Sequence, residues 1–161
     1  MTYFICQSEF TISKDTLFSF HEGSDGFRVL VSLAKGIEVI QAPNSLAIGS
    51  TAIMKVPILP FIKMKWIAEH TGYVKNDSFT DTQISGPFNR FIHQHKFRSL
   101  NQDRSVLIDQ IEILFWFWPI TRFFILPILK KQFQTRHKAT AEFLGCEYKL
   151  MFCGYSSSVV D

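Results

Sequence analysis

The sequence predicts an α+β domain in which a seven-stranded, curved antiparallel sheet wraps around a long C-terminal helix, with two short helices between strands 1 and 2. Between residues 37 and 114, apolar residues recur with a period of two, and turn-forming residues separate the runs. Residues 120–144 instead carry an approximate helical stripe. The 161 residues are enough for one domain with one core.

The N-terminal part predicts a strand and then the two short helices. Residues 2–12 alternate as a strand does, and Ser13 or Asp15 offers an N-cap for a helix that Gly23 ends. A second helix follows and stops at Gly36. Six further strands in sequence then imply an antiparallel meander. We expect these strands at residues 37–42, 50–57, 63–74, 78–85, 89–100 and 105–114.

The last helix is expected over residues 120–144, where Pro127 should kink it or mark its true start. Its apolar stripe needs a surface to pack against, and the concave face of the sheet is large enough. We expect the domain to cover residues 1–145. Residues 146–161 form a tail that is at most partly ordered, with a short extended piece at 148–152.

The candidate site lies on a hairpin that turns at residues 86–87, a Gly-Pro pair. Side chains alternate along a strand, so each arm presents a set of residues on one face. The two predicted inward sets are Phe79, Asp81 and Gln83 before the turn, and Phe91, His93, His95 and Phe97 after it. The hairpin therefore carries polar, titratable groups on the face that should be buried.

A carboxylate joins this face from the next strand. A turn near residues 101–103 places Asp109 beside His95, with Ile111 on the same face. His93, His95 and Asp109 are therefore candidates for acid–base catalysis. The favoured alternative is a satisfied hydrogen-bond network, or a site for the head group of an apolar ligand. A third interpretation is that the two histidines with Asp81 or Asp109 ligate zinc, but a His-x-His pair on a strand without a third placed ligand is a weak signal, so we predict no metal site.

Other polar residues leave alternatives open. Arg136 on the last helix either binds an anionic head group or pairs with a sheet carboxylate such as Glu112, and pairing is favoured. Glu69 and His70 face opposite sides of their strand. Trp66 shares the face of His70, which favours His70 as the inward residue.

Composition narrows the class of protein. A net charge of +3 with scattered Lys and Arg gives no nucleic-acid footprint. Three cysteines without CxxC spacing support neither a disulfide framework nor a zinc knuckle and fit a reducing cytoplasm. Charged residues and prolines interrupt the apolar run at 111–129, so it is not a membrane span. Its aromatic cluster at 115–118 nevertheless has the composition of a segment that contacts a membrane surface.

The order of these elements resembles the helix-grip fold of the SRPBCC superfamily, which includes START lipid-binding domains, polyketide cyclases and the birch-pollen allergen type. The resemblance extends to a bacterial ligand-binding or cyclase-like branch. The motifs that carry it are Gly86-Pro87-Phe88, Phe91-x-His93-x-His95-x-Phe97, Asp109-x-Ile111-Glu112, Arg136-His137-x-x-Thr140, Phe18-x-Phe20-His21 and Trp66-x-Ala68-Glu69-His70. The resemblance implies an internal, mainly apolar cavity.

We therefore expect a carrier or sensor of a hydrophobic small molecule such as a lipid, isoprenoid or polyketide-like compound. The alternatives are a cyclase or dehydratase and a membrane-surface adaptor. We expect no cofactor and no nucleic-acid partner, and a monomer or weak dimer in the cytoplasm. The expected ligand-binding residues are Phe79, Asp81, Gln83, Phe91, His93, His95, Phe97, Asp109, Ile111, Trp116, Phe124 and Arg136.

Overall fold

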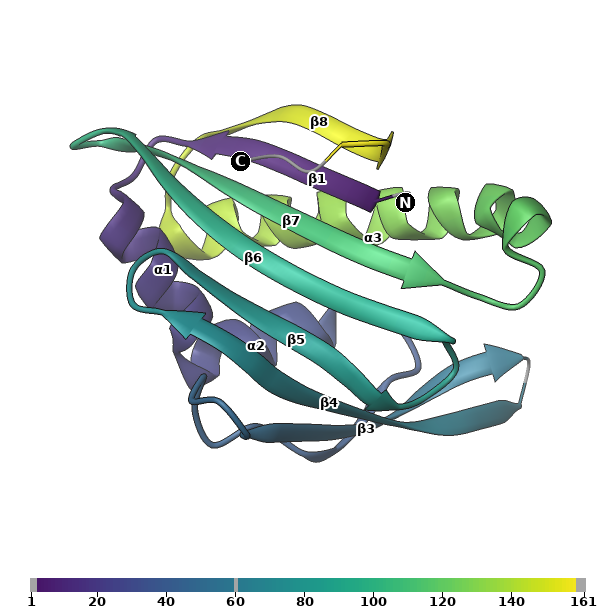
Figure 1. The fold of residues 1–161 in the computed structure, drawn as a ribbon. Helices are drawn as coiled ribbons and strands as arrows, with labels where there is room; N and C mark the ends of the chain where they lie inside the picture. Colours follow the sequence, from purple (N-terminus) through teal and green to yellow (C-terminus); the bar gives the residue numbers. More distant parts are fainter. Residues whose placement is uncertain (1–2, 60, 159–161) are drawn as a thin grey trace.

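The computed structural model describes residues 3–59 and 61–158. It contains one antiparallel sheet of eight strands in the order β2-β3-β4-β5-β6-β7-β1-β8. Figure 1 shows the three helices on one face of this sheet, with α3 running along β1 and β7. The elements are β1 (Tyr3–Phe10), α1 (Lys14–Glu22), α2 (Ser24–Ser32), β2 (Glu38–Gln41), β3 (Thr51–Leu59), β4 (Ile62–Val74), β5 (Ser78–Ser85), β6 (Arg90–Asn101), β7 (Arg104–Leu114), α3 (Trp118–Leu144) and β8 (Tyr148–Ser156).

The predicted α+β class is confirmed, including the long C-terminal helix and the two short helices before β2. The predicted strand count of seven is wrong, because the sheet has eight. The additional strand, β8, covers Tyr148–Ser156 where only a short extended piece was expected. It pairs with β1 from Phe10↔Tyr148 to Tyr3↔Ser156 and so covers an edge of β1 that would otherwise expose unpaired backbone groups.

Helix α3 begins two residues before the predicted start and continues through Pro127. Proline at position 127 leaves the carbonyl of Phe123 without its helical donor. Both residues lie on the exposed side of the helix, where water can hydrogen-bond to that carbonyl. Pro119 fits the first turn, where no helical N–H bond is required, and Gly145 ends the helix in a left-handed conformation. None of the helices within the described ranges combines the length and apolarity that crossing a bilayer requires.

The caps of α1 follow the prediction. Ser13 Oγ accepts a hydrogen bond from the backbone N–H of Thr16 at 3.2 Å, and Gly23 ends the helix. Helix α2 begins at once and stops at Ser32, short of Gly36. The two helices meet closely at Gly26, where a Cβ atom would lie 1.9 Å from the carbonyl oxygen of Phe20.

The core between sheet and helices contains two apolar clusters. The first gathers side chains of β1, α1, β5, β6, β7 and the end of α3: Phe10, Leu17, Phe18, Leu46, Phe79, Phe97, Leu107 and Ala141. The second lies between β1, β7 and the middle of α3: Phe4, Cys6, Ile111, Ile113, Leu129 and Phe133. The strands and α3 cross both clusters, so residues between the two sets occupy a layer of their own.

Candidate functional site

The layer between the two apolar clusters is polar. On β7, Asp109 lies between Leu107 of the first cluster and Ile111 of the second. The same interruption occurs on every element that crosses both clusters. The polar residues are Ser8 on β1, Asp81 on β5, His93 and His95 on β6, Asp109 on β7 and His137 on α3, and all except Asp81 are buried.

Asp109 is the centre of this layer. One carboxylate oxygen, Oδ1, lies 2.9 Å from His93 Nε2 and 2.7 Å from His95 Nδ1. The other, Oδ2, accepts from His137 Nε2 at 2.7 Å. The His95 contact lacks hydrogen-bond geometry and acts as an ion pair at this distance. One carboxylate, 2% exposed, therefore faces three imidazoles from two strands and a helix.

Asp81 provides a second carboxylate at the open side of the layer. Its Oδ1 contacts His70 Nδ1, and its Oδ2 lies 3.4 Å from His95 Nε2. The Asp81 side chain is 25% exposed, so this side of the layer reaches solvent. His95 lies between two carboxylates and is the bridge that joins them.

All five histidines of the chain are buried, with exposures of 1–8%. Four of them contact Asp81 or Asp109, and the fifth, His21 on α1, has its ring centroid 6.2 Å from that of His95. The five histidines come from four different elements, namely α1, β4, β6 and α3. Such a concentration is specific to this layer, because histidine is usually at least partly exposed.

Burial and charge separate the pKa values of these groups. Burial raises the pKa of Asp109, but the surrounding histidines outweigh burial and hold it well below its ordinary value. Burial lowers the pKa of His95, but the facing carboxylates outweigh it and raise the pKa overall. Burial, reinforced by the charge on His95, lowers the pKa of His93 to about 4. Burial also lowers the pKa of His21 to about 3.

The layer therefore places an imidazole with a raised pKa, His95, beside one with a lowered pKa, His93. The rings of His93 and His95 are 3.8 Å apart between centroids. One is poised to donate a proton and the other to accept one, which is the pairing that acid–base chemistry requires.

Ser8, His137 and Asp109 have the contacts of a hydrolytic triad. With His137 Nε2 donating to Asp109, the neutral ring accepts from the Ser8 hydroxyl at Nδ1, at 2.7 Å. Ser8 is completely buried, however, so its oxygen cannot reach a substrate. Cys6 Sγ also approaches His137 Nδ1, at 4.0 Å, and its pKa is raised by a hydrogen bond to Cys153 and by burial, which keeps it a thiol.

Three buried nitrogen atoms of β4 have no hydrogen-bond partner among the described residues, and one of them, His70 Nδ1, contacts the Asp81 carboxylate. The other two are Nε2 of His70 and Nε1 of Trp66, whose side chains lie on the same face of the strand. The Trp66 ring packs edge-on against Phe91 at 5.0 Å and Phe88 at 5.7 Å. A buried, unpaired donor has a free-energy cost that a bound acceptor would remove.

An aromatic chain leads from the layer to the end of the sheet. Phe91 lies 6.3 Å from His93 between ring centroids, Phe88 stacks on Phe91 at 5.2 Å, and Phe115 meets Phe88 at 5.6 Å. Phe88 and Phe91 are half-buried, as is Phe115. The chain ends at the loop between β7 and α3.

Two hollows lie away from this layer. One, of about 290 Å³, is on the outer face of the sheet over Gln94 and Gln110. The other, of about 340 Å³, is between α1 and the end of α3 beside Phe20 and Phe143. Neither hollow is lined by a member of the polar layer.

The structure brings together four of the twelve predicted site residues, namely Asp81, His93, His95 and Asp109. Five others flank this layer: Phe79 and Phe97 in the first cluster, Ile111 and Phe91 in or against the second, and Gln83, whose amide donates to the Phe88 carbonyl at 2.7 Å. Trp116 and Phe124 were expected at a cavity but are 63% and 71% exposed at the surface.

The predicted pairing of Arg136 with Glu112 is wrong. Glu112 faces the outer side of the sheet, where it forms a bidentate pair with Arg90. The Arg136 guanidinium instead lies 5.1 Å from the ring centroid of Phe133, near enough to the layer that its charge contributes to lowering the pKa of His93.

Sequence reasoning did not include His21, His70 and His137 in the site, although it favoured His70 as inward-facing. Each had a usable signal, since each occupies the apolar face of its own helix or strand. Among residues that could bind a metal, Asp81, His93 and His95 offer ligand atoms within 4.8 Å of one another. A divalent cation there would compete with the contacts of both histidines to Asp109.

No protein-family model and no curated protein matches this chain. Solved structures do match this chain. A nucleoside-diphosphate sugar epimerase from Corynebacterium glutamicum aligns with a TM-score of 0.69 and 17% identity over 88% of this chain, which spans only 29% of that protein. Norcoclaurine synthase from Thalictrum flavum, in complex with dopamine and hydroxybenzaldehyde, aligns with a TM-score of 0.66 and 13% identity. The alignment covers 89% of this chain and 87% of that protein. An HSP90 activator from Plasmodium falciparum aligns with a TM-score of 0.62 and 15% identity over 92% of this chain and 100% of that protein. These likenesses are all below 25% identity and show the fold alone, which is a helix-grip fold.

Proposed function

We propose that the chain binds a mainly apolar small molecule with a polar group, between the inner face of the sheet and α3, as a carrier or sensor. The observation that carries this proposal is the buried layer of five histidines and two aspartates between two aromatic clusters. A lipid, isoprenoid or polyketide-like compound has the matching division into apolar body and polar end. The three cysteines are free, which fits the proposed cytoplasmic setting.

Fold stability does not account for this layer. Burying charged groups costs several kcal/mol per ion, and well-packed apolar residues of similar volume often stabilise a core as much or more. Apolar side chains already fill the positions on both sides of Asp109. The layer is therefore better explained by what it binds than by what it stabilises.

The open side of the layer suggests where the polar group binds. Asp81 is its most exposed member, and the unpaired nitrogens of His70 and Trp66 lie on the neighbouring strand β4. A hydroxyl group placed there would accept from Trp66 Nε1 and could form a second hydrogen bond with His70 Nε2 in either ring tautomer. The apolar body of the ligand would then lie along Phe91, Phe88 and Phe115.

The first test is native mass spectrometry of the freshly purified protein, followed by extraction and identification of any retained compound. We expect an apolar compound with one oxygen-bearing end. His70→Leu should lose it, and Trp66→Phe, which removes the N–H together with part of the ring that packs on Phe88 and Phe91, should weaken binding by at least about tenfold, the loss expected for one hydrogen bond. Thr71→Val is the matched control, because Thr71 faces the other side of β4 and bonds Thr82. Equal retention by His70→Leu and the control would contradict the proposed binding mode.

A second function is favoured by the opposed pKa shifts of His93 and His95. On this alternative the chain is a cyclase or dehydratase in which these histidines and Asp109 transfer protons. Norcoclaurine synthase shows that a protein of this fold can hold small aromatic molecules. His95→Gln should then abolish turnover of the extracted compound while leaving its affinity largely intact. Loss of affinity without any turnover to lose would favour the carrier.

A further inference from the structure

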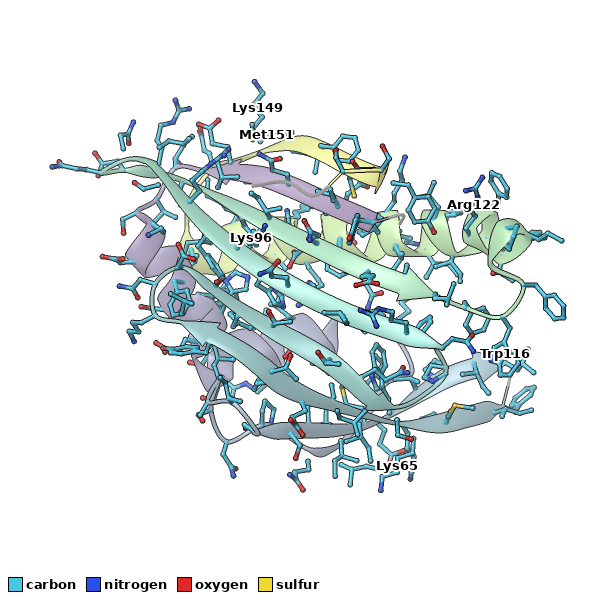
Figure 2. The ribbon with its side chains drawn as sticks, in the orientation of Figure 1. Lys65, Lys96, Trp116, Arg122, Lys149 and Met151 are labelled. Atoms are coloured by element: carbon cyan, nitrogen blue, oxygen red, sulfur yellow. The ribbon has the colours of Figure 1, made fainter. Side chains whose placement is uncertain are left out.

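One end of the molecule exposes an unusual set of aromatic side chains. Figure 1 shows that the β3–β4 turn and the β7–α3 loop lie at the same end, and Figure 2 places Trp116 and Arg122 there. Phe61, in the β3–β4 turn, is fully exposed, and Phe117 is 81% exposed. Further exposed apolar residues beside this turn, in this loop and in the first turns of α3 include Leu59, Ile62, Trp116, Ile120, Phe123, Phe124 and Ile128. We call these nine residues the aromatic end.

The backbone at two of these positions is unfavourable for phenylalanine. Phe61 has φ 68° and Phe117 has φ 54°, both in the left-handed region. The remaining non-glycine residue with positive φ among those described is Asn76, a residue type that tolerates it. Glycine or asparagine would suit both turns better, and neither Phe side chain packs into the core. Stability therefore does not explain phenylalanine at either position.

The sequence around the aromatic end is predominantly basic. From residue 113 to residue 141 it has no Asp or Glu, and Arg122, Lys130 and Lys131 lie in the first half of α3, nearest this end. Lys63 and Lys65 follow the exposed turn, where Lys63 pairs with Glu38 of β2 at 3.7 Å. Arg122 lies 4.9 Å from the ring centroid of Phe123, which places a cation against an exposed aromatic ring.

We propose that the aromatic end docks on an anionic lipid bilayer, with Phe61 and Phe117 as two separate insertion points. Exposed aromatic residues bordered mainly by Lys and Arg are the composition of protein surfaces that bind the headgroup region. The excess of positive charge also argues against a second copy docking by this same surface, because like charges would face each other. The proposal stands independently of the ligand, although the aromatic chain through Phe115 ends at this surface.

The test is flotation with vesicles of phosphatidylcholine alone or mixed with phosphatidylserine. We expect the wild type to float with the mixed vesicles, and high salt to reduce binding. Phe61→Asn and Phe117→Asn should each lower the bound fraction at least about tenfold, since each removes one inserted aromatic ring. Both should leave the melting temperature unchanged or raise it, because asparagine adopts the left-handed conformation at lower cost.

Phe143→Gln is the matched control. Phe143 is 52% exposed on the same helix α3 but at its other end, so we expect unchanged flotation. Two results would overturn the proposal: no flotation of the wild type with anionic vesicles, or equal flotation of the three variants. A concentration-dependent dimer that Phe61→Asn or Phe117→Asn dissociates, with no vesicle binding, would overturn it in favour of self-association. Failure of flotation leaves the ligand extraction experiment unaffected.

Discussion

Replacing Asp109 with asparagine tests whether this carboxylate is the charged centre of the polar layer. The substitution keeps the shape of the side chain and removes its charge. Asp109 faces His93, His95 and His137 at 2.7–2.9 Å and is 2% exposed. Removing one partner of a buried charge pair costs about 3–5 kcal/mol, because the other charge stays buried and unpaired. We expect Asp109→Asn to lower the free energy of unfolding by this amount.

Urea denaturation measures the loss, with an unchanged m-value showing that the same surface unfolds. Asp81→Asn is the matched control, since it makes the same chemical change at a carboxylate that faces two histidines rather than three. Its side chain is 25% exposed, so water can partly solvate the histidines that lose the carboxylate. We expect Asp81→Asn to lower the free energy of unfolding by roughly 1–2 kcal/mol. The difference between the two variants isolates the effect of complete burial.

Proton NMR of the histidine rings gives a second readout. In the wild type, the pKa of His95 is raised by the facing carboxylates Asp109 and Asp81 against the effect of burial. With Asp109 neutral, burial should dominate and the His95 pKa should fall below its ordinary value. A variant Asp109→Asn that costs no more than Asp81→Asn and leaves the His95 titration unchanged would refute the central role of Asp109.

Three further outcomes follow from the structure. The free energy of unfolding should decrease as pH falls from 6.5 toward 4: His93 and His21 are held neutral, with pKa values of about 4 and about 3, and the unfolded chain gains protons first. The raised pKa of His95 acts mainly above pH 6.5, where it makes the free energy of unfolding decrease as pH rises. Thermal melts should therefore show a melting temperature that falls from pH 6.5 to pH 4, and a constant or rising one would contradict this. Gly26→Ala should cost about 2 kcal/mol or more in urea denaturation, because its Cβ would clash with the Phe20 carbonyl. Zinc should leave the melting temperature unchanged, because Asp109 already engages both histidines of the candidate metal set; a clear increase would contradict this.

The β6–β7 part of the site was predictable because antiparallel register follows from turn positions. A turn near residues 101–103 requires His95 to pair with Asp109, and the structure has this pair. Asp81 pairs with His93 from the other side, as the Gly-Pro turn indicates. Alternation then places both histidines on the face that the apolar neighbours bury.

The contributions of the helices were not predictable in the same way. Register fixes which strand residues face each other, but nothing in the sequence fixes how α3 is rotated and shifted against the sheet. His137 was therefore assigned to an apolar stripe, without a partner, although it donates to Asp109. For the same reason the sequence does not predict that His21 on α1 lies near His95. The Arg136–Glu112 error was avoidable, because Glu112 is three residues from Asp109 and so must face the opposite side of β7.

The two features that stability does not explain lie at opposite ends of one aromatic path. Phe115 follows β7 directly and precedes the exposed Trp116 and Phe117, and its ring leads through Phe88 and Phe91 to His93. A molecule leaving a bilayer at the aromatic end would meet half-buried rings first and polar groups last, which matches an apolar body with a polar end. An enzyme acting on a water-soluble substrate would have no use for strained, exposed phenylalanines beside its entrance. The arrangement as a whole therefore favours the carrier over the acid–base enzyme.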